Sequence, residues 1–413
     1  MVRPGAAAPQ ARAPQHDATV LQPRVAQATP DQLMLGATPN KNRCAMKLSE
    51  LLKKENNNLD VFRLVAACMV IYGHAYAVVP QAGHVDVVAR LLGHDYSGSL
   101  AVKIFFFLSG LVVTNSLLHK RDVLHFAIAR FFRIWPALVL VTVASALLLG
   151  PLVSALSLGD YFSQGGTYRY VLDNLLLKTN YSLPGVFVAN PDKAVVNGSL
   201  WTLPHEVGAY IALLAVFMVG VFRLPVLALA IFLLLLADPL TGNRLLFTWR
   251  TPLSEVDLLA PCFALGALLA LYKERIEVGL ASVSGLVLLY LLFRSSAYSF
   301  YFFYAALFTT ILYLSGLAAV RRFKPRSDLS YGVYLWGFPV QQTLQWMLPQ
   351  QGTHFNQVVS LGVTLVLGFA SWHLVEKRGI AMGQSVIGRL SARQTRHENE
   401  ANEGARRSAA PLA

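Results

Sequence analysis

The apolar stretch VFRLVAACMVIYGH, residues 61–74, contains two side chains that could do chemistry, Arg63 and His74. They are eleven positions apart, and eleven helical steps of about 100° make three turns plus about 20°, so both lie on one helix face. At about 1.5 Å per residue they are about 16 Å apart along the axis. This layout suits a substrate that is bound by a fixed cation at one depth and meets a titratable base at another. Two structural alternatives stay open: Arg63 pairs with Asp60, or His74 only packs.

A second candidate is the arginine pair of ARFFRIWPAL, Arg130 and Arg133, which lie three positions apart and therefore share a helix face. Guanidinium groups match phosphate oxygens in geometry, so the pair predicts a site for a phosphate-bearing ligand. The alternative is ordinary anchoring by positive charge at the cytoplasmic end of a membrane helix. Spacing alone favours anchoring.

A third candidate is Glu206 in NGSLWTLPHEVGAY, where Trp201 is expected at the membrane interface. A carboxylate at or below the outer membrane boundary needs a partner or water, which makes Glu206 a candidate acid–base or orienting group. The neighbouring His205 is expected only to line the interface.

Three further motifs predict structural roles. Ser109 and Gly110 in KIFFFLSGLVV indicate close helix packing. Tyr331 and Tyr334 in DLSYGVYLWGFPV are typical of an aromatic belt at the membrane interface. Glu376 and the two basic residues that follow it are expected to form a cytoplasmic anchor.

The composition places these residues in a membrane. Of 413 residues, 55% are hydrophobic and only 14% are charged, too few to cover the surface of a soluble protein of this size. We therefore expect an all-α polytopic membrane protein in contact with lipid. The net charge of +13 indicates basic cytoplasmic loops rather than a nucleic-acid partner. The three cysteines have no metal-ligand spacing, and no bound cofactor or metal is predicted.

The chain is expected to divide into a disordered N-terminal extension at 1–55, a membrane domain at 56–380 and a polar C-terminal tail at 381–413. The membrane domain is expected to contain about ten transmembrane helices, at 60–80, 99–118, 131–150, 200–221, 225–240, 255–272, 278–293, 298–318, 329–348 and 356–375. One set of connecting loops carries 11 Lys or Arg in 32 residues and the opposite set carries 7 in 92. This asymmetry predicts that both termini are cytoplasmic and that the long segment 151–199 lies outside.

Taken in order, these stretches resemble the acyltransferase 3 family of integral membrane acyltransferases. LDVFRLVAACMVIYGH is similar to the family's first-helix motif of an arginine, ten residues and a histidine. FFFLSGLVVTNSLL, ARFFRIWPAL, GSLWTLPHEVGAY, LSYGVYLWGFPV and LVEKR are similar to the motifs that follow. The resemblance covers about residues 58–376, and the ordered set is specific where each single motif is weak.

The resemblance implies transfer of an acyl group, often acetyl, from cytoplasmic acyl-CoA to a hydroxyl of an extracytoplasmic glycan or lipid-linked sugar, at the inner membrane of a bacterium. It implies that His74 is the catalytic histidine and Arg63 its motif partner. It also implies that Arg130 and Arg133 bind the phosphates of CoA, and it favours Glu206 as a catalytic residue.

The sequence departs from the family pattern at three positions. Gly337 stands where many members have a histidine, Arg378 where a proline is usual, and His205 where a small or hydrophobic residue is commoner. The glycine puts a second proton carrier in doubt.

Two other functions stay open at this point. One is a proton-coupled secondary transporter in which His74 and Glu206 relay protons. Such a transporter typically has an internal repeat, and the sequence shows none. The other is a partner in polysaccharide assembly with no enzymatic activity, which would tolerate replacement of His74.

Overall fold

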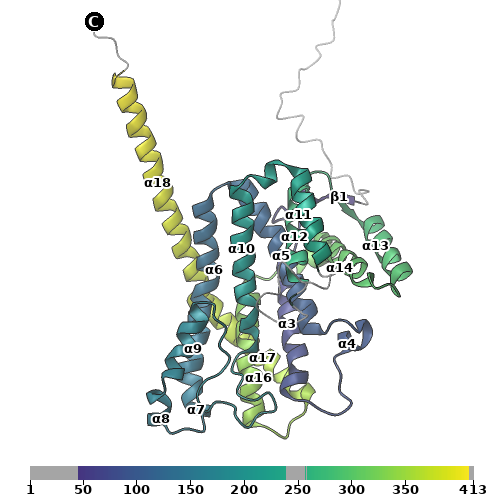
Figure 1. Ribbon diagram of the computed structural model, residues 1–413, viewed down its shortest axis with the longest axis vertical. Helices are drawn as coiled ribbons and strands as arrows, with labels where there is room; N and C mark the ends of the chain where they lie inside the picture. The colour runs from purple at the N-terminus through teal and green to yellow at the C-terminus, as the bar shows by residue number, and fades with distance from the viewer. Residues whose placement is uncertain (1–44, 239–255, 257, 409–413) are drawn as a thin grey trace, which may run out of the picture. The chain divides into compact units, whose positions relative to one another are not determined.

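The computed structural model describes residues 45–238, 256 and 258–408, with side chains described as far as residue 393. Most of these residues are helical, as the sequence predicts (Figure 1). The predicted loop 241–254 and the adjoining ends of the spans 225–240 and 255–272 lie outside the described residues, as do positions 1–44 of the predicted N-terminal extension.

Each of the ten predicted spans contains a helix within its described part. These helices are α3 Leu59–Val78, α5 Ser97–Lys120, α6 Val123–Ala144, α10 Thr202–Met218, α11 Pro225–Ala237, α12 Leu259–Leu271, α13 Leu280–Phe293, α14 Ser299–Gly316, α16 Ser330–Met347 and α17 Thr353–Ser371. The shorter elements are α4 Val87–Leu92, η1 Ser145–Leu149, α7 Gly150–Val153, α8 Leu158–Ser163, α9 Gly165–Leu175, η2 Gly198–Trp201, η3 Val221–Arg223, α15 Ala318–Arg322 and η6 Trp372–Glu376.

Six helical segments of the described chain are long and apolar enough to cross a membrane. They are Leu59–Val78, Ser97–Lys120, Val123–Val153, Gly198–Met218, Ser299–Gly316 and Thr353–Arg393. The apolar helices α11, α12 and α13 have only 13 or 14 residues, about 20 Å at about 1.5 Å per residue. Helix α16 is long enough, with 18 residues, but buries three glutamines and is therefore less apolar. Length and composition support a multi-pass membrane protein with six clear spans.

Close helix packing forms the centre of the bundle, where α5 lies against α12 and α16 lies against both α3 and α17. A Cβ added at Gly110 of α5 would meet the backbone of Phe263, and one at Gly266 of α12 would meet the backbone of Leu111. The close packing predicted at Gly110 is therefore confirmed. Because these helices approach so closely, polar side chains between them face confined spaces instead of lipid.

The folded part of the chain begins earlier than predicted. Strand β1 (Ala45–Lys47) pairs antiparallel with β2 (Glu277–Gly279), and helix α2 (Leu48–Leu51) follows it directly. Leu48 and Leu51 are fully buried in the core of the bundle. The prediction of disorder as far as residue 55 is therefore wrong for residues 45–55, because these two leucines bury apolar surface against the membrane domain.

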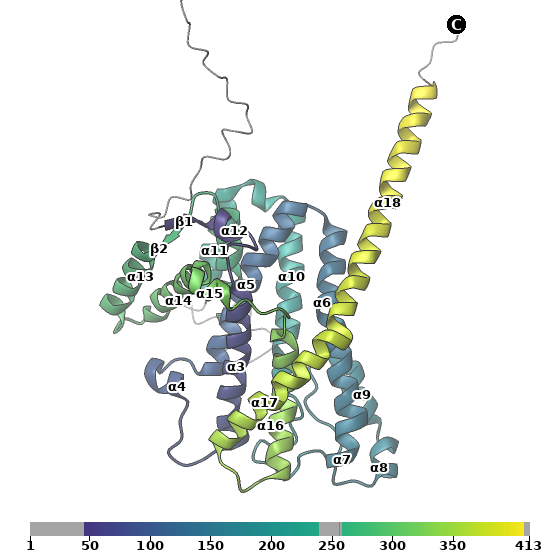
Figure 2. The ribbon, with the colours of Figure 1, turned by 180° about the vertical axis from the view of Figure 1, so that it is seen from behind.

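The last helix, α18 (Lys377–Ser408), continues from α17 through the π-helical turn η6 and occupies most of the predicted polar tail. It packs against α6, as Figure 2 shows. A Cβ at Gly379 would lie 2.7 Å from Pro136 of α6, and a Cβ at Gly383 would lie 2.9 Å from Phe132. The two glycines therefore let α18 approach α6 closely.

The long segment 151–199 is structured. Its helices α8 and α9 and the chain that follows them enclose a small core with Tyr161, Tyr170 and Phe187 buried. The segment returns to the bundle at Asn197, whose amide donates to the carbonyl of Leu335 in α16. This contact fixes the start of η2 and α10, and with it the position of Glu206.

Candidate active site

A cavity of about 120 Å³ lies between α3, α5, α6, α10 and α16. Four of the five predicted site residues line it: Arg63, Arg130, Arg133 and Glu206. We call this space the arginine cavity. The fifth residue, His74, does not line it.

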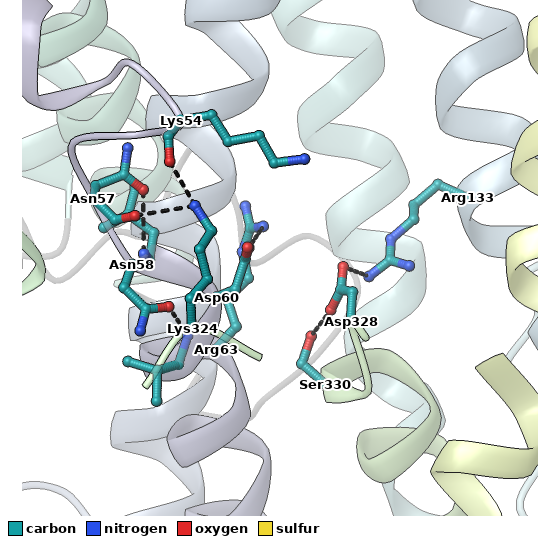
Figure 3. A network of polar contacts seen from close by, with 11 residues as sticks. Lys54, Asn57, Asn58, Asp60, Arg63, Arg133, Lys324, Asp328 and Ser330 are labelled. Carbon is teal, nitrogen blue, oxygen red and sulfur yellow. Dashed lines mark hydrogen bonds and ion pairs between the residues drawn. The ribbon is translucent and has the colours of Figure 1, made fainter. Parts of the chain in front are cut away.

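Arg133 is held by two carboxylates that come from other parts of the chain. Its Nη2 lies 2.7 Å from Asp328, which precedes α16, and its Nη1 lies 3.4 Å from Glu376 at the end of η6. Figure 3 shows the first of these ion pairs, with Ser330 donating to the other oxygen of Asp328. The guanidinium also lies over the rings of Tyr331 and Trp372. Arg133 is therefore more than a membrane anchor, but much of its charge is already compensated.

Glu376 has a different role from the predicted cytoplasmic anchor. It is only 1% exposed, accepts a hydrogen bond from Ser371 and pairs with Arg133. That prediction is wrong because the π-helical turn directs this side chain into the bundle, and only the basic residues after it, Lys377 and Arg378, are exposed.

Asp328 was not identified from the sequence, where it is a single acidic residue before an apolar helix. Burial alone would raise the pKa of this carboxyl group, but the positive charges of Arg133 and Arg63 outweigh burial and hold the pKa below its ordinary value. The carboxylate is therefore charged when the two arginines are in place.

Glu206 is hydrogen-bonded inside the arginine cavity. The hydroxyl of Tyr210, one turn later in α10, donates to Glu206 over 2.5 Å, and the hydroxyl of Ser109 in α5 lies 2.8 Å from the same Tyr210 oxygen. Since Tyr210 has a single hydroxyl proton, Ser109 is the donor in the second bond. Arg130 lies over the Tyr210 ring at 5.9 Å and has no ion pair within the described part of the chain. Neither the role of Tyr210 nor that of Ser109 was identified from the sequence. The contact of Ser109 with Tyr210 joins residues 101 positions apart, whereas the position of Tyr210 one turn after Glu206 was a local signal that could have identified it.

Arg63 combines the two roles considered from the sequence. It pairs with Asp60 at 3.5 Å (Figure 3). Its side chain also lines the arginine cavity. The start of α3 is fixed by Asn58, which caps the helix by accepting from the amide of Val61. Lys324 donates to the carbonyl oxygens of Lys54 and Asn57 just before this cap.

His74 lies in a separate environment, further along α3. Its ring packs edge to face against the ring of Phe338 in α16, with centroids 5.1 Å apart. A Cβ at Gly198 would lie 2.6 Å from the same phenyl ring. The Nδ1 of His74 is buried and has no hydrogen-bond partner among the described residues. A buried imidazole nitrogen without a partner is costly in a structural histidine and is available to a substrate group.

The departure from the family pattern at Gly337 has a packing reason. A Cβ at this position would lie 2.7 Å from Ile71, one turn before His74 on α3. With this isoleucine in place, a histidine at 337 would push α16 away from α3.

The two predicted aromatic-belt residues on α16, Tyr331 and Tyr334, are also inside the protein: both line the arginine cavity. The aromatic-belt prediction is therefore wrong for this pair, since α16 is covered by α3 and α17.

The arginine cavity can bind an anionic group through Arg63 and Arg130. The carboxylate of Glu206, which accepts a hydrogen bond from Tyr210, lines the same cavity. His74 can accept a proton at a second position, about eleven residues and about 16 Å further along α3. Such a pair of positions suits a long ligand with charge at one end and a reactive group at the other.

Most of the chain is similar in sequence to known proteins. The family model described as an acyltransferase domain, that of the acyltransferase 3 family, matches residues 56–373. An O-acetyl transferase of Shigella phage Sf6 is 30% identical over 335 residues, which cover 78% of this chain and 96% of the phage protein. Nodulation protein 10 of Rhizobium leguminosarum bv. viciae is 25% identical over 367 residues, covering 81% and 95% of the two chains.

No solved structure matches the chain significantly. The family match nevertheless includes every residue that lines the arginine cavity, and it extends over the six clear spans as far as residue 373. The protein is accordingly a member of the acyltransferase 3 family, and its activity is that of an acyltransferase.

Proposed function

We propose that the protein is a membrane O-acyltransferase that moves an acetyl group from cytoplasmic acyl-CoA to a hydroxyl of an extracytoplasmic or lipid-linked carbohydrate. The observation that carries this proposal is the arginine cavity, which is lined both by cations from α3 and α6 and by the carboxylate of Glu206. The similarity to an O-acetyl transferase supports acetyl as the group transferred.

The donor would bind with phosphate oxygens at Arg130 and Arg63. Arg130 is the better ligand of its pair, because Arg133 already holds Asp328 and Glu376. Arg133 would instead add positive potential and shape the wall of the cavity. Glu206, fixed by Tyr210, would orient the donor or take part in proton transfer.

The acceptor would react at His74. The neutral imidazole removes the proton of the acceptor hydroxyl while its oxygen attacks the thioester carbonyl carbon. A carbon–oxygen bond forms, the carbon–sulfur bond breaks, and the proton passes from His74 to the departing thiolate. The extended arm of CoA would bridge the separation between the arginine cavity and His74, and holding both substrates in one site supplies much of the rate.

The membrane arrangement is part of the same proposal. All ten helical segments would cross the bilayer of a bacterial inner membrane. Helices α11, α12 and α13 are short for this, so they would either lie nearly parallel to the membrane normal or cross a locally thinned bilayer. Both termini would be cytoplasmic. The charge asymmetry of the loops supports this orientation, since one set carries 11 Lys or Arg in 32 residues and the opposite set 7 in 92. The arginine end of α3 would then face the cytoplasmic donor and the His74 end the external acceptor.

Replacement of His74 tests the proposal. His74→Ala should leave a folded membrane protein but remove ester groups from the surface glycan of a deletion strain that carries this copy. His94→Ala is the matched control, because His94 is exposed and lies outside the arginine cavity. A normal ester content with His74→Ala, at wild-type expression, would exclude His74 as the base.

A further inference from the structure

A second cavity, of about 250 Å³, lies at the end of the bundle where α5 ends and α6 begins. Side chains of α5 and α6 form one wall. The opposite wall is the first part of α18, with Ile380, Gly383, Gln384 and Ile387. We call this space the α18 groove. Its two arginines, Arg130 and Arg133, were predicted from the sequence to bind phosphate, whereas its α18 wall was not predicted.

The charged lining of the α18 groove is mostly cationic. Three cations, Lys120, Arg130 and Arg133, line it together with His125 and one acidic residue, Asp122. Lys120 donates from Nζ to Nε2 of His125 over 2.7 Å. Asp122 is engaged as the N-cap of α6, since its side chain accepts from the amide of His125. The groove therefore offers a net positive surface to an anion.

The α18 groove and the arginine cavity share three lining residues, Val113, Arg130 and Arg133. The arginine pair thus stands between an outer groove and an inner cavity. A ligand with phosphates at the pair could extend in both directions, outward into the groove and inward toward Glu206.

We propose that α18 is part of the donor site and that the α18 groove holds the anionic nucleotide end of acyl-CoA. This inference rests on the proposed function and adds a location for the part of the donor furthest from the thioester. Lys120 contacts the phosphates, Ile380 and Ile387 contact the apolar faces of the nucleotide, and the acyl arm passes Arg130 into the arginine cavity.

The position of α18 is essential to this site and depends on glycine. Gly383 lines the groove, and a Cβ there would lie 2.9 Å from Phe132 of α6. A larger residue must therefore move α18 or the phenyl ring. Gly388, five residues further along α18, has nothing within 4 Å of its Cβ position and provides a matched control.

The test is equilibrium binding of CoA without an acyl group to the purified full-length protein, together with the rate of thioester consumption as acetyl-CoA is varied. Lys120→Ala and Gly383→Ala should each weaken CoA binding, by about tenfold for the lost charge-assisted contact of Lys120. The maximal rate at saturating acetyl-CoA should be close to wild type. ADP should compete with CoA in the wild type and less well in Lys120→Ala.

The controls are Gly388→Ala and Arg389→Ala, which alter the same helix at exposed positions outside the groove. Both should bind CoA as the wild type does. If Lys120→Ala and Gly383→Ala also bind like the wild type, while the wild type binds CoA and transfers acetyl, the α18 groove is not the nucleotide site and the proposed function stands. If the wild type does not bind CoA, both proposals are overturned.

Discussion

The two ion pairs of Arg133 predict that this residue stabilises the protein far more than its neighbour Arg130. Arg133→Met leaves Glu376, only 1% exposed, without its cation. Removal of one partner of a buried ion pair costs about 3–5 kcal/mol, because the other charge stays buried. Arg133 is 21% exposed and Asp328 is 25% exposed, so part of the charge is screened by solvent and we expect about 3 kcal/mol.

The matched control is Arg130→Met, on the same helix face and with the same apolar replacement. Within the described residues Arg130 loses only its contact with the Tyr210 ring, worth about 0.5–1 kcal/mol at a partly exposed site. The two variants should thus differ by about 2 kcal/mol in stability. The assay is thermal unfolding of the purified proteins in one detergent or nanodisc, in which Arg133→Met should have the clearly lower midpoint.

A second substitution tests the cause. Glu376→Gln in the Arg133→Met background removes the unpaired charge, so the thermal midpoint of the double variant should be higher than that of Arg133→Met. In the wild-type background Glu376→Gln should lower the thermal midpoint, because it breaks the ion pair. Equal midpoints for Arg133→Met and Arg130→Met, or no recovery in the double variant, would show that Glu376 is not a buried charge held by Arg133.

Three further results are expected. Arg130→Lys keeps the positive charge but loses the forked geometry, so acetyl-CoA binding should weaken by about tenfold; an unchanged titration curve would reduce Arg130 to an anchor. Reporter fusions after Arg121 and Lys324 should be cytoplasmic and one after Lys193 external, and an external signal at either of the first two sites would contradict the orientation. Because the pKa of Asp328 is lowered, its contribution to stability is present above the ordinary aspartate pKa of about 3.9 and is lost as the pH falls below it. The thermal midpoint should therefore fall between pH 5 and pH 3 by more in the wild type than in Asp328→Asn, and parallel curves would exclude this role.

Local sequence patterns were sufficient for the helices and for residues that share one helix. Every predicted span contains a helix in its described part, because apolar periodicity and length are properties of neighbouring residues. In the same way, the spacing of Arg63 and His74 placed both on α3 before any contact between helices was known.

Contacts between helices could not be obtained in this way. Glu376 was assigned to an anchor because its sequence neighbours are basic, yet the residue that determines its role is Arg133, 243 positions earlier. The aromatic pair on α16 had the spacing of an interface belt, but α16 is covered by its neighbours, and its tyrosines line the arginine cavity.

The sequence by itself therefore determined the class of protein, the positions of the apolar helices and the candidate residues, because each depends on composition or on local spacing. Only the tertiary structure decided that Arg63, Arg130 and Glu206 line one cavity while His74 lies apart from it. The physical reason is that helix periodicity sets the direction of a side chain only relative to its own axis. Which side chains meet depends on how closely the axes approach, and small residues such as Gly110, Gly337 and Gly383 decide that approach through contacts with distant parts of the chain.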